Sequence, residues 1–247
     1  MSTEEKYVPP EVPHYFQNHS QWDSINQLGM WLFLATEVLF FGGLFVGFIL
    51  LKGRYPEAFE AGHNELSVFY GGLNTVVLLA SSLTVALAIQ ASDSNNKDRI
   101  IKLLWATMAL AGVFLVIKTI EYTGKWNSCL LPGNLFGFPE LDAAGAPAIK
   151  DGIIQYAAHC KEAIAGHQAA SDMPAHSNVF FSLYFIMTGI HGLHVVIGMG
   201  LFLWVIKSAK AGRFGPNYKG SLENVGLYWH LVDLIWIFLF PTLYRVG

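Results

Sequence analysis

Charge is scarce in this sequence, and the shortage narrows its class at once. Asp, Glu, Lys and Arg make up 13% of the 247 residues, whereas a typical soluble domain is about 25% charged. Hydrophobic residues make up 53% and aromatic residues 14%. This composition is typical of a membrane protein. The net charge is only −3 and no Lys/Arg-rich run is interleaved with aromatic residues, so we expect no nucleic-acid partner.

Several familiar functional patterns are also absent. The sequence has no glycine-rich phosphate loop, no Cys-x-x-Cys pair and no Ser-His-Asp arrangement, so we expect no catalytic site in this chain. The opening stretch MSTEEKYVPPEVPHYF lacks the basic start and apolar core of a secretory signal. Prolines at positions 9, 10 and 13 instead predict an extended polar tail over residues 1–27.

Long apolar runs, by contrast, are abundant. A helix needs about 20 predominantly apolar residues to cross a bilayer. Five segments meet this length: residues 28–51, 68–91, 100–122, 178–206 and 225–244. We therefore expect an all-α integral membrane protein, in which residues 28–247 form a bundle of five transmembrane helices.

The positive charges predict the orientation of these spans. Short cytoplasmic loops carry an excess of Lys and Arg, and long translocated loops count for little. One side of the predicted membrane domain holds eight positive residues: Lys6, Lys97, Arg99, Lys102, Lys207, Lys210, Arg213 and Lys219. This side is predicted to be cytoplasmic, with the N-terminus inside and the C-terminus in the periplasm. The expected location is the bacterial inner membrane, which the chain crosses several times.

The stretch 125–175 is too polar to cross the membrane and is predicted to be an extended outside loop. It is rich in proline and glycine, although residues 151–170 have a composition that favours a short helix. The loop holds the only two cysteines, Cys129 and Cys160. A disulfide is permitted in the periplasm, and two unrelated thiols are the alternative.

Polar side chains inside the predicted spans are the candidate functional residues. Ionisable groups are expensive at membrane depth and by default indicate function. Glu37 lies in the middle of the first span, where it fits either proton transfer or a structural, lipid-facing role. The other intramembrane polar residues are Asn74, Lys118, Glu121, His191, His194, His230 and Asp233. Five amphipathic ring residues lie near predicted span ends, where such rings favour the membrane interface: Trp22, Tyr122, Trp126, Tyr228 and Tyr244.

The histidines leave two readings open. His191 and His194 share a helical face, and His230 and Asp233 share another, because residues three apart lie on one side of a helix. In the first reading Asp233 accepts a hydrogen bond from a histidine and fixes its tautomer within a buried polar cluster. In the second the histidines ligate haem or copper, although no Glu-x-x-His motif of di-iron bundles occurs within a span.

Small residues predict close helix packing. Gly43 and Gly47 form a Gly-x-x-x-Gly pair, which lets a partner helix approach closely.

Four stretches together resemble the subunit III family of the haem–copper oxidases, the cytochrome c oxidase subunit III family. They are ATEVLFFGGLF (35–45), LNTVVLLASSLT (73–84), TGIHGLHVVIG (188–198) and YWHLVDLIWIFLF (228–240). The resemblance implies a chain without haem or copper, since subunits I and II hold those groups. It also implies packing against subunit I, retention of phospholipid, and support of oxidase stability and of proton uptake.

The resemblance also assigns residues. It implies that Glu37 is the family's buried glutamate, associated with a lipid head group, and that His191, His194, His230 and Asp233 form its buried polar cluster. Glu223 falls where the family has an acid before its last helix.

This chain departs from the long form of the family, which has seven helices instead of five, so the lipid cleft of the long form cannot be complete within it. The loop 125–175 is also longer than usual, and we expect it to contact subunit II or an electron-donor complex.

The leading hypothesis is therefore an accessory, non-catalytic subunit of an oxygen-reducing, proton-translocating oxidase in the aerobic respiratory chain. The same subunit in a quinol oxidase, or a homologue associated with nitric oxide reductase, is the nearest alternative, because donors bind other subunits. A proton-coupled transporter is a different class, but the five spans show no internal repeat of the kind that transporters often have. An intramembrane metalloenzyme is the remaining alternative.

Overall fold

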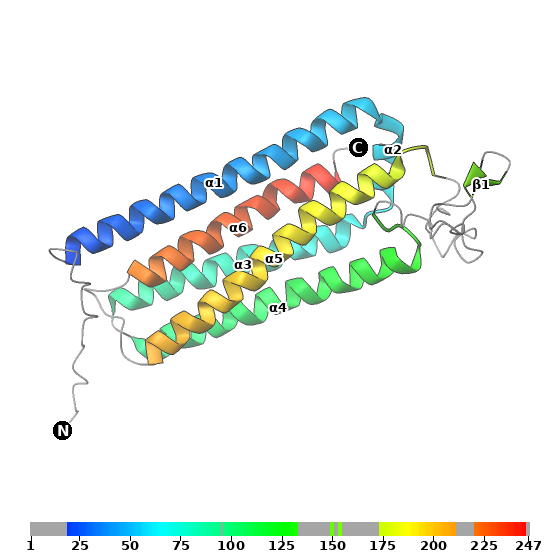
Figure 1. Cartoon of the computed structure of the whole chain (residues 1–247). Coiled ribbons are helices and arrows are strands. Elements are labelled where there is room, and N and C mark those ends of the chain that lie inside the picture. Colours follow the sequence, from blue (N-terminus) through cyan, green and yellow to red (C-terminus); the bar gives the residue numbers. More distant parts are fainter. Residues whose placement is uncertain are drawn as a thin grey trace, which may run out of the picture. The chain divides into compact units, whose positions relative to one another are not determined.

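The computed structural model describes residues 19–94, 96–132, 149–150, 153–154, 173–210 and 220–245. In these residues it has six helices and one short antiparallel hairpin (Figure 1). The elements are α1 His19–Arg54, α2 Pro56–Asn64, α3 Val68–Asp93, α4 Lys97–Asn127, β1 Ile149–Lys150, β2 Ile153–Ile154, α5 Ser177–Lys210 and α6 Gly220–Tyr244.

Five of the described helices, α1, α3, α4, α5 and α6, are long and apolar enough to cross a membrane. This confirms the five predicted spans and the all-helical membrane class. The helices are longer than the predicted runs, because polar turns extend them at their ends. The 31 residues of α4, for example, reach roughly 46 Å, beyond the ~30 Å hydrocarbon core.

Two elements differ from expectation. The short helix α2 was not predicted, because its nine residues are too few for a span; Pro56 begins it at a position where proline is favoured. Its Phe59 ring packs against Phe48 and Phe180, at 5.1 and 5.4 Å between ring centroids. The helix expected over 151–170 is wrong at its start, since residues 153–154 pair with 149–150 as strands. Residues 155–172 lie outside the described part of the chain.

The chain forms two compact units. Unit 1 comprises Met1–Gly42, Thr75–Phe114 and His191–Ile237, and unit 2 comprises Gly43–Asn74, Leu115–Ile190 and Phe238–Gly247. In both units, glycines bring neighbouring helices close together. A Cβ atom on Gly198 of unit 1 would lie 2.7 Å from the Trp229 ring, and one on Gly71 of unit 2 would lie 2.7 Å from the Phe240 ring. Small residues at contacts of this kind are typical of packed membrane helices.

No described residue of this chain packs closely against the Gly-x-x-x-Gly pair, so a close approach by a partner helix stays a prediction for another chain. An added Cβ atom at Gly43 or Gly47 would meet nothing within 4 Å. The spacing correctly identifies a smooth helix face, but spacing alone does not say whether a helix of the same chain covers that face.

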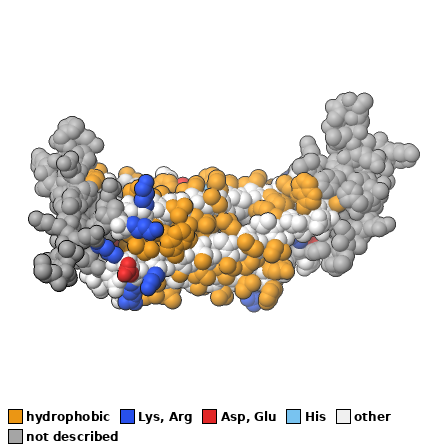
Figure 2. All heavy atoms as spheres, turned by 90° about the horizontal axis from the view of Figure 1, so that it is seen from below, with side chains coloured by type: hydrophobic (Ala, Val, Ile, Leu, Met, Phe, Trp, Pro, Cys, Tyr) orange, Lys and Arg blue, Asp and Glu red, His pale blue; other side chains and the backbone are white. Residues whose placement is uncertain are grey.

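The surface agrees with a membrane environment. On the face that Figure 2 shows, hydrophobic side chains cover much of the described helix surface, and Lys and Arg side chains are few. The first span has only 17% of its most apolar window buried within the chain, against 50% for the last. Helix α1 therefore presents most of its apolar surface outward, where lipid or a partner protein replaces water.

Candidate functional site

Glu37 and His194 form the centre of the candidate site in unit 1. Glu37 lies on α1 between Leu34 and Phe41, which are both buried. Residues three and four apart share a helix face, so the Glu37 side chain lies on the buried face of α1. Its Oε2 atom lies 3.1 Å from Nε2 of His194 on α5. Their side chains are 17% and 15% exposed. The two sequence candidates therefore satisfy each other at membrane depth, as paired intramembrane ionisable groups usually do.

Aromatic rings fix the histidine in this pair. The Tyr228 hydroxyl on α6 donates a 2.9 Å hydrogen bond to the backbone carbonyl of His194. The Tyr228 ring stacks at 6.4 Å from the imidazole, and Phe41 meets it edge-on at 5.5 Å. Tyr228 is buried and forms part of the site. The prediction of an interfacial position did not include this role.

A pocket of about 480 Å³ opens beside the pair. Its lining residues are Met30, Phe33, Glu37, His194, Ile197, Leu201, Asn224, Val225 and Tyr228. The wall is mostly apolar, with one carboxylate–imidazole pair and one amide. A pocket of this composition suits an apolar ligand with a polar group at one end.

The remaining members of the expected histidine cluster lie in different settings. His191 is fully buried between the rings of Phe114 and Trp236, at 5.6 and 5.2 Å. His230 Nδ1 lies 2.6 Å from the Ser82 hydroxyl on α3. Asp233 is 3% exposed and lies near the same Ser82, but neither of its carboxylate oxygens is in hydrogen-bonding geometry with a described residue.

Among the described residues, the hydrogen bond expected from a histidine to Asp233 is therefore not formed. Sequence spacing gave the helical faces of His194 and His230 correctly. It could not show that α1 supplies the partner of the first and α3 the partner of the second. No sequence signal pointed to Ser82 in this role.

A second polar group lies in unit 2, around Lys118. The Lys118 ammonium donates to Glu121 Oε2 at 2.8 Å and to the hydroxyls of Tyr184 and Tyr244 at 3.0 Å each. The Tyr244 hydroxyl in turn donates to Glu121 Oε1 at 2.6 Å. All four side chains are buried. The network joins α4, α5 and α6, and the Tyr244 ring completes it at the last residue of α6. Its place at the membrane interface stays a prediction.

Other polar groups of unit 2 are also held inside. Lys125 donates to the backbone carbonyl of Glu65, and the Tyr122 hydroxyl lies 2.7 Å from that of Thr188. Asn74 is fully buried, and neither its amide nitrogen nor its amide oxygen has a hydrogen-bond partner in the described residues. In unit 1, Glu223 is partly exposed and lies in the first turn of α6, where an acidic side chain complements the helix dipole.

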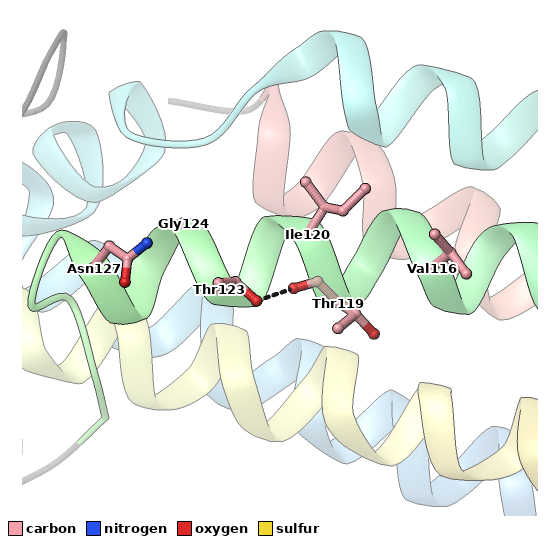
Figure 3. Close-up of a pocket in the computed structure, with 6 residues that line it drawn as sticks. All are labelled: Val116, Thr119, Ile120, Thr123, Gly124 and Asn127. Carbon is pink, nitrogen blue, oxygen red and sulfur yellow. Dashed lines mark hydrogen bonds between the residues drawn. The ribbon is translucent and has the colours of Figure 1, made fainter.

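The outer surface of α4 carries a shallow groove of about 450 Å³ (Figure 3). It is lined by Val116, Thr119, Ile120, Thr123, Gly124 and Asn127, all from this one helix. The Thr123 hydroxyl donates to the carbonyl of Thr119 at 2.8 Å, the contact dashed in Figure 3. Thr119 likewise donates to Leu115. These two hydroxyls are satisfied within their helix, so Asn127 is the remaining polar side chain that lines the groove.

The remaining features are the cysteines and the possible metal ligands. Cys129 is buried just after α4, and no described cysteine is free. Cys160 lies outside the described residues, so the pairing of the two remains a prediction. Among the residues that the structure describes, no group of three or more His, Cys, Asp or Glu side chains is placed to hold a metal ion.

Comparison with known proteins gives the family. A family model described as "Cytochrome c oxidase subunit III" matches residues 16–130 and 161–247. The chain is 30% identical over 218 residues to "Cytochrome c oxidase subunit 3" of Thermostichus vulcanus, which covers 88% of this chain and 85% of that protein. It is 25% identical over 239 residues to the protein of that name from Synechocystis sp., covering 96% and 81%. The corresponding values for Gallus gallus are 28% over 227 residues, covering 89% and 69%. The chain belongs to the cytochrome c oxidase subunit III family.

Proposed function

We propose that the chain is the accessory, non-catalytic subunit III of a terminal haem–copper oxidase in aerobic respiration. The observation that carries this proposal is the family match, which runs through all five spans. Membership implies a complex with the other oxidase subunits, and we place subunit I as the packing partner, with subunit II in the same complex. Haem and copper then reside in those partners.

The pocket beside Glu37 and His194 is proposed to hold a phospholipid. Asn224 is the fifth residue of α6, about 6 Å from the helix start, so this end of the pocket lies near the membrane surface. Glu37 lies deeper, and the wall between is apolar. An acyl chain fits the apolar wall, with the polar part of the lipid at the Asn224 end. The 3.1 Å contact between Glu37 and His194 also favours a role in proton uptake, because a carboxylate and an imidazole at this distance can share a proton.

The topology proposed for this function places the N-terminus in the cytoplasm and the C-terminus outside the bacterial inner membrane. Basic residues support it: Lys97, Arg99 and Lys102 lie at the start of α4, and Lys207 and Lys210 at the end of α5. The loop 125–175 is then outside, where we propose the Cys129–Cys160 disulfide and a contact with subunit II or an electron-donor complex. A quinol oxidase, or a homologue associated with nitric oxide reductase, would use the same residues of this chain with a different donor.

Purification in mild detergent through a tag on this chain tests the proposed function. The visible spectrum and the metal content of the eluate should show haem and copper in a fixed ratio to the chain. A tag on an unrelated five-span protein of the same membrane is the control for non-specific carry-over. An eluate containing the chain without haem would contradict the proposal.

A further inference from the structure

His230 on α6 presents a polar atom to the outside of unit 1. Its Nδ1 atom is bonded to the Ser82 hydroxyl at 2.6 Å, and the residue is only partly buried. No hydrogen bond of the described residues reaches its Nε2 atom. In either tautomer of a neutral imidazole, Nε2 is a donor or an acceptor, so this atom has a hydrogen-bonding capacity that no described residue uses.

The depth of His230 limits what that partner can be. It is the eleventh residue of α6, about 15 Å from the first residue and about 21 Å from the last. With a hydrocarbon core of about 30 Å, this position lies well inside the membrane. Neither water nor lipid head groups reach this depth, and an unsatisfied polar atom there is costly. A lipid tail offers no hydrogen-bonding group, so lipid does not complete the site.

Several exposed threonines of the spans have no such need. The hydroxyls of Thr36, Thr119 and Thr242 each donate to a carbonyl of their own helix, and His194 is paired with Glu37. His230 differs because one ring nitrogen is satisfied inside and the other faces out.

Exposed apolar side chains neighbour Ser82 and His230 along α3 and α6. Leu83 follows Ser82 directly and is 61% exposed, and Leu79, one turn earlier on α3, is 49% exposed. Leu234, one turn after His230 on α6, is 48% exposed. We call the surface formed by Leu79, Ser82, Leu83, His230 and Leu234 the His230 face. It has an apolar rim around one polar group, a pattern that suits a helix of a packed membrane complex.

We propose that the His230 face docks a transmembrane helix of another oxidase subunit, which supplies a hydrogen-bonding group to Nε2 of His230. This inference rests on the proposed function, because it takes its partner from the oxidase complex. A second copy of the chain is the other possible occupant, and the labelling experiment below distinguishes it from a different subunit.

Photo-crosslinking in the assembled complex tests the contact directly. A benzophenone amino acid is placed at Leu83 or at Leu234, with Val113 on α4, 46% exposed, as the matched apolar control position. After illumination in native membranes, mass spectrometry identifies the adducts. Peptides from a transmembrane segment of another oxidase subunit at Leu83 and Leu234 are expected. Adducts with phospholipid alone, or with a second copy of the chain, would overturn the proposal.

Substitution of the ring tests the hydrogen bond. His230→Leu removes it and His230→Gln keeps a polar group. Interhelical hydrogen bonds in membranes change association by about three- to tenfold, so the fraction of complex surviving a detergent titration should fall by that factor in His230→Leu and much less in His230→Gln. Equal retention in both variants would overturn the proposal. The wild-type purification separates the two claims: if it brings haem while Leu83 and Leu234 label only lipid, the docking inference fails and the proposed function stands.

Discussion

Lys118→Met tests the buried network of unit 2 most severely. The change keeps an apolar stem of similar length but removes the ammonium that donates to Glu121, Tyr184 and Tyr244. The Glu121 carboxylate would keep only the Tyr244 donor, at 2.6 Å, among these contacts. Removing one partner of a buried ion pair costs about 3–5 kcal/mol, because the other charge stays buried without compensation. Both partners are 6% exposed, so screening by solvent reduces this figure little.

The assay is unfolding of the purified chain in detergent, followed by circular dichroism. We expect Lys118→Met to lower the free energy of unfolding by about 3–5 kcal/mol. The double variant Lys118→Met/Glu121→Gln should lose less than the sum of its single changes, because it leaves no unpaired charge. Lys102→Met, at an exposed lysine of α4, is the matched control and should stay within about 0.5 kcal/mol of the wild type. A Lys118→Met loss no larger than that of the control would refute the reasoning.

Four further predictions concern the remaining features. Glu37→Gln should assemble normally with a modest loss of oxygen consumption, since the amide still bonds to His194; normal assembly without any turnover would show an obligatory proton path. His194→Leu should reduce the yield of assembled complex more than the rate of electron transfer per haem, and the reverse order would contradict a structural role. Gly198→Ala should destabilise the chain by about 1–3 kcal/mol against the Trp229 ring, while Gly43→Ala, facing open space, should not; equal effects on the unfolding midpoint would disprove the packing argument. Deleting residues 140–170 should weaken co-purification of the electron donor, and unchanged donor recovery would count against the proposed loop contact.

Some of the fold follows from composition and length alone. A membrane span is decided by a run of apolar residues, and this is why the five predicted spans lie within five long helices. Helix α2 could not be predicted from an apolar run, because only three of its nine residues are buried: Ala58, Phe59 and Gly62. Its position depends on packing against Phe180 of α5, a contact far away in the sequence.

The polar sites show the limit of helical periodicity. Spacing placed His191 and His194 on one face, but it could not identify the helix opposite each of them. The structure pairs His194 with Glu37, over 157 positions, and leaves Asp233 beside Ser82. One sequence signal could have found this pair. A carboxylate in the middle of a membrane span needs a hydrogen-bond donor, and His194 lies at a compatible depth in the fourth span.

The partners of Lys118 were missed for a related reason. The spacing Lys-x-x-Glu showed that Lys118 and Glu121 could pair on α4. An ammonium has three donors, however, so one carboxylate contact leaves two of them unsatisfied in an apolar interior. Two further acceptors are therefore expected near Lys118, and the hydroxyls of Tyr184 and Tyr244 supply them.

The claim that this chain is an accessory subunit without a catalytic group of its own is tested most directly by removing it from the purified oxidase. The measurement is the haem and copper content per complex, together with the initial rate of oxygen consumption, before and after the chain is stripped away. We predict that metal content and initial rate are retained by the remaining subunits. Loss of haem or copper with the chain, or metal found on the isolated chain, would contradict the account.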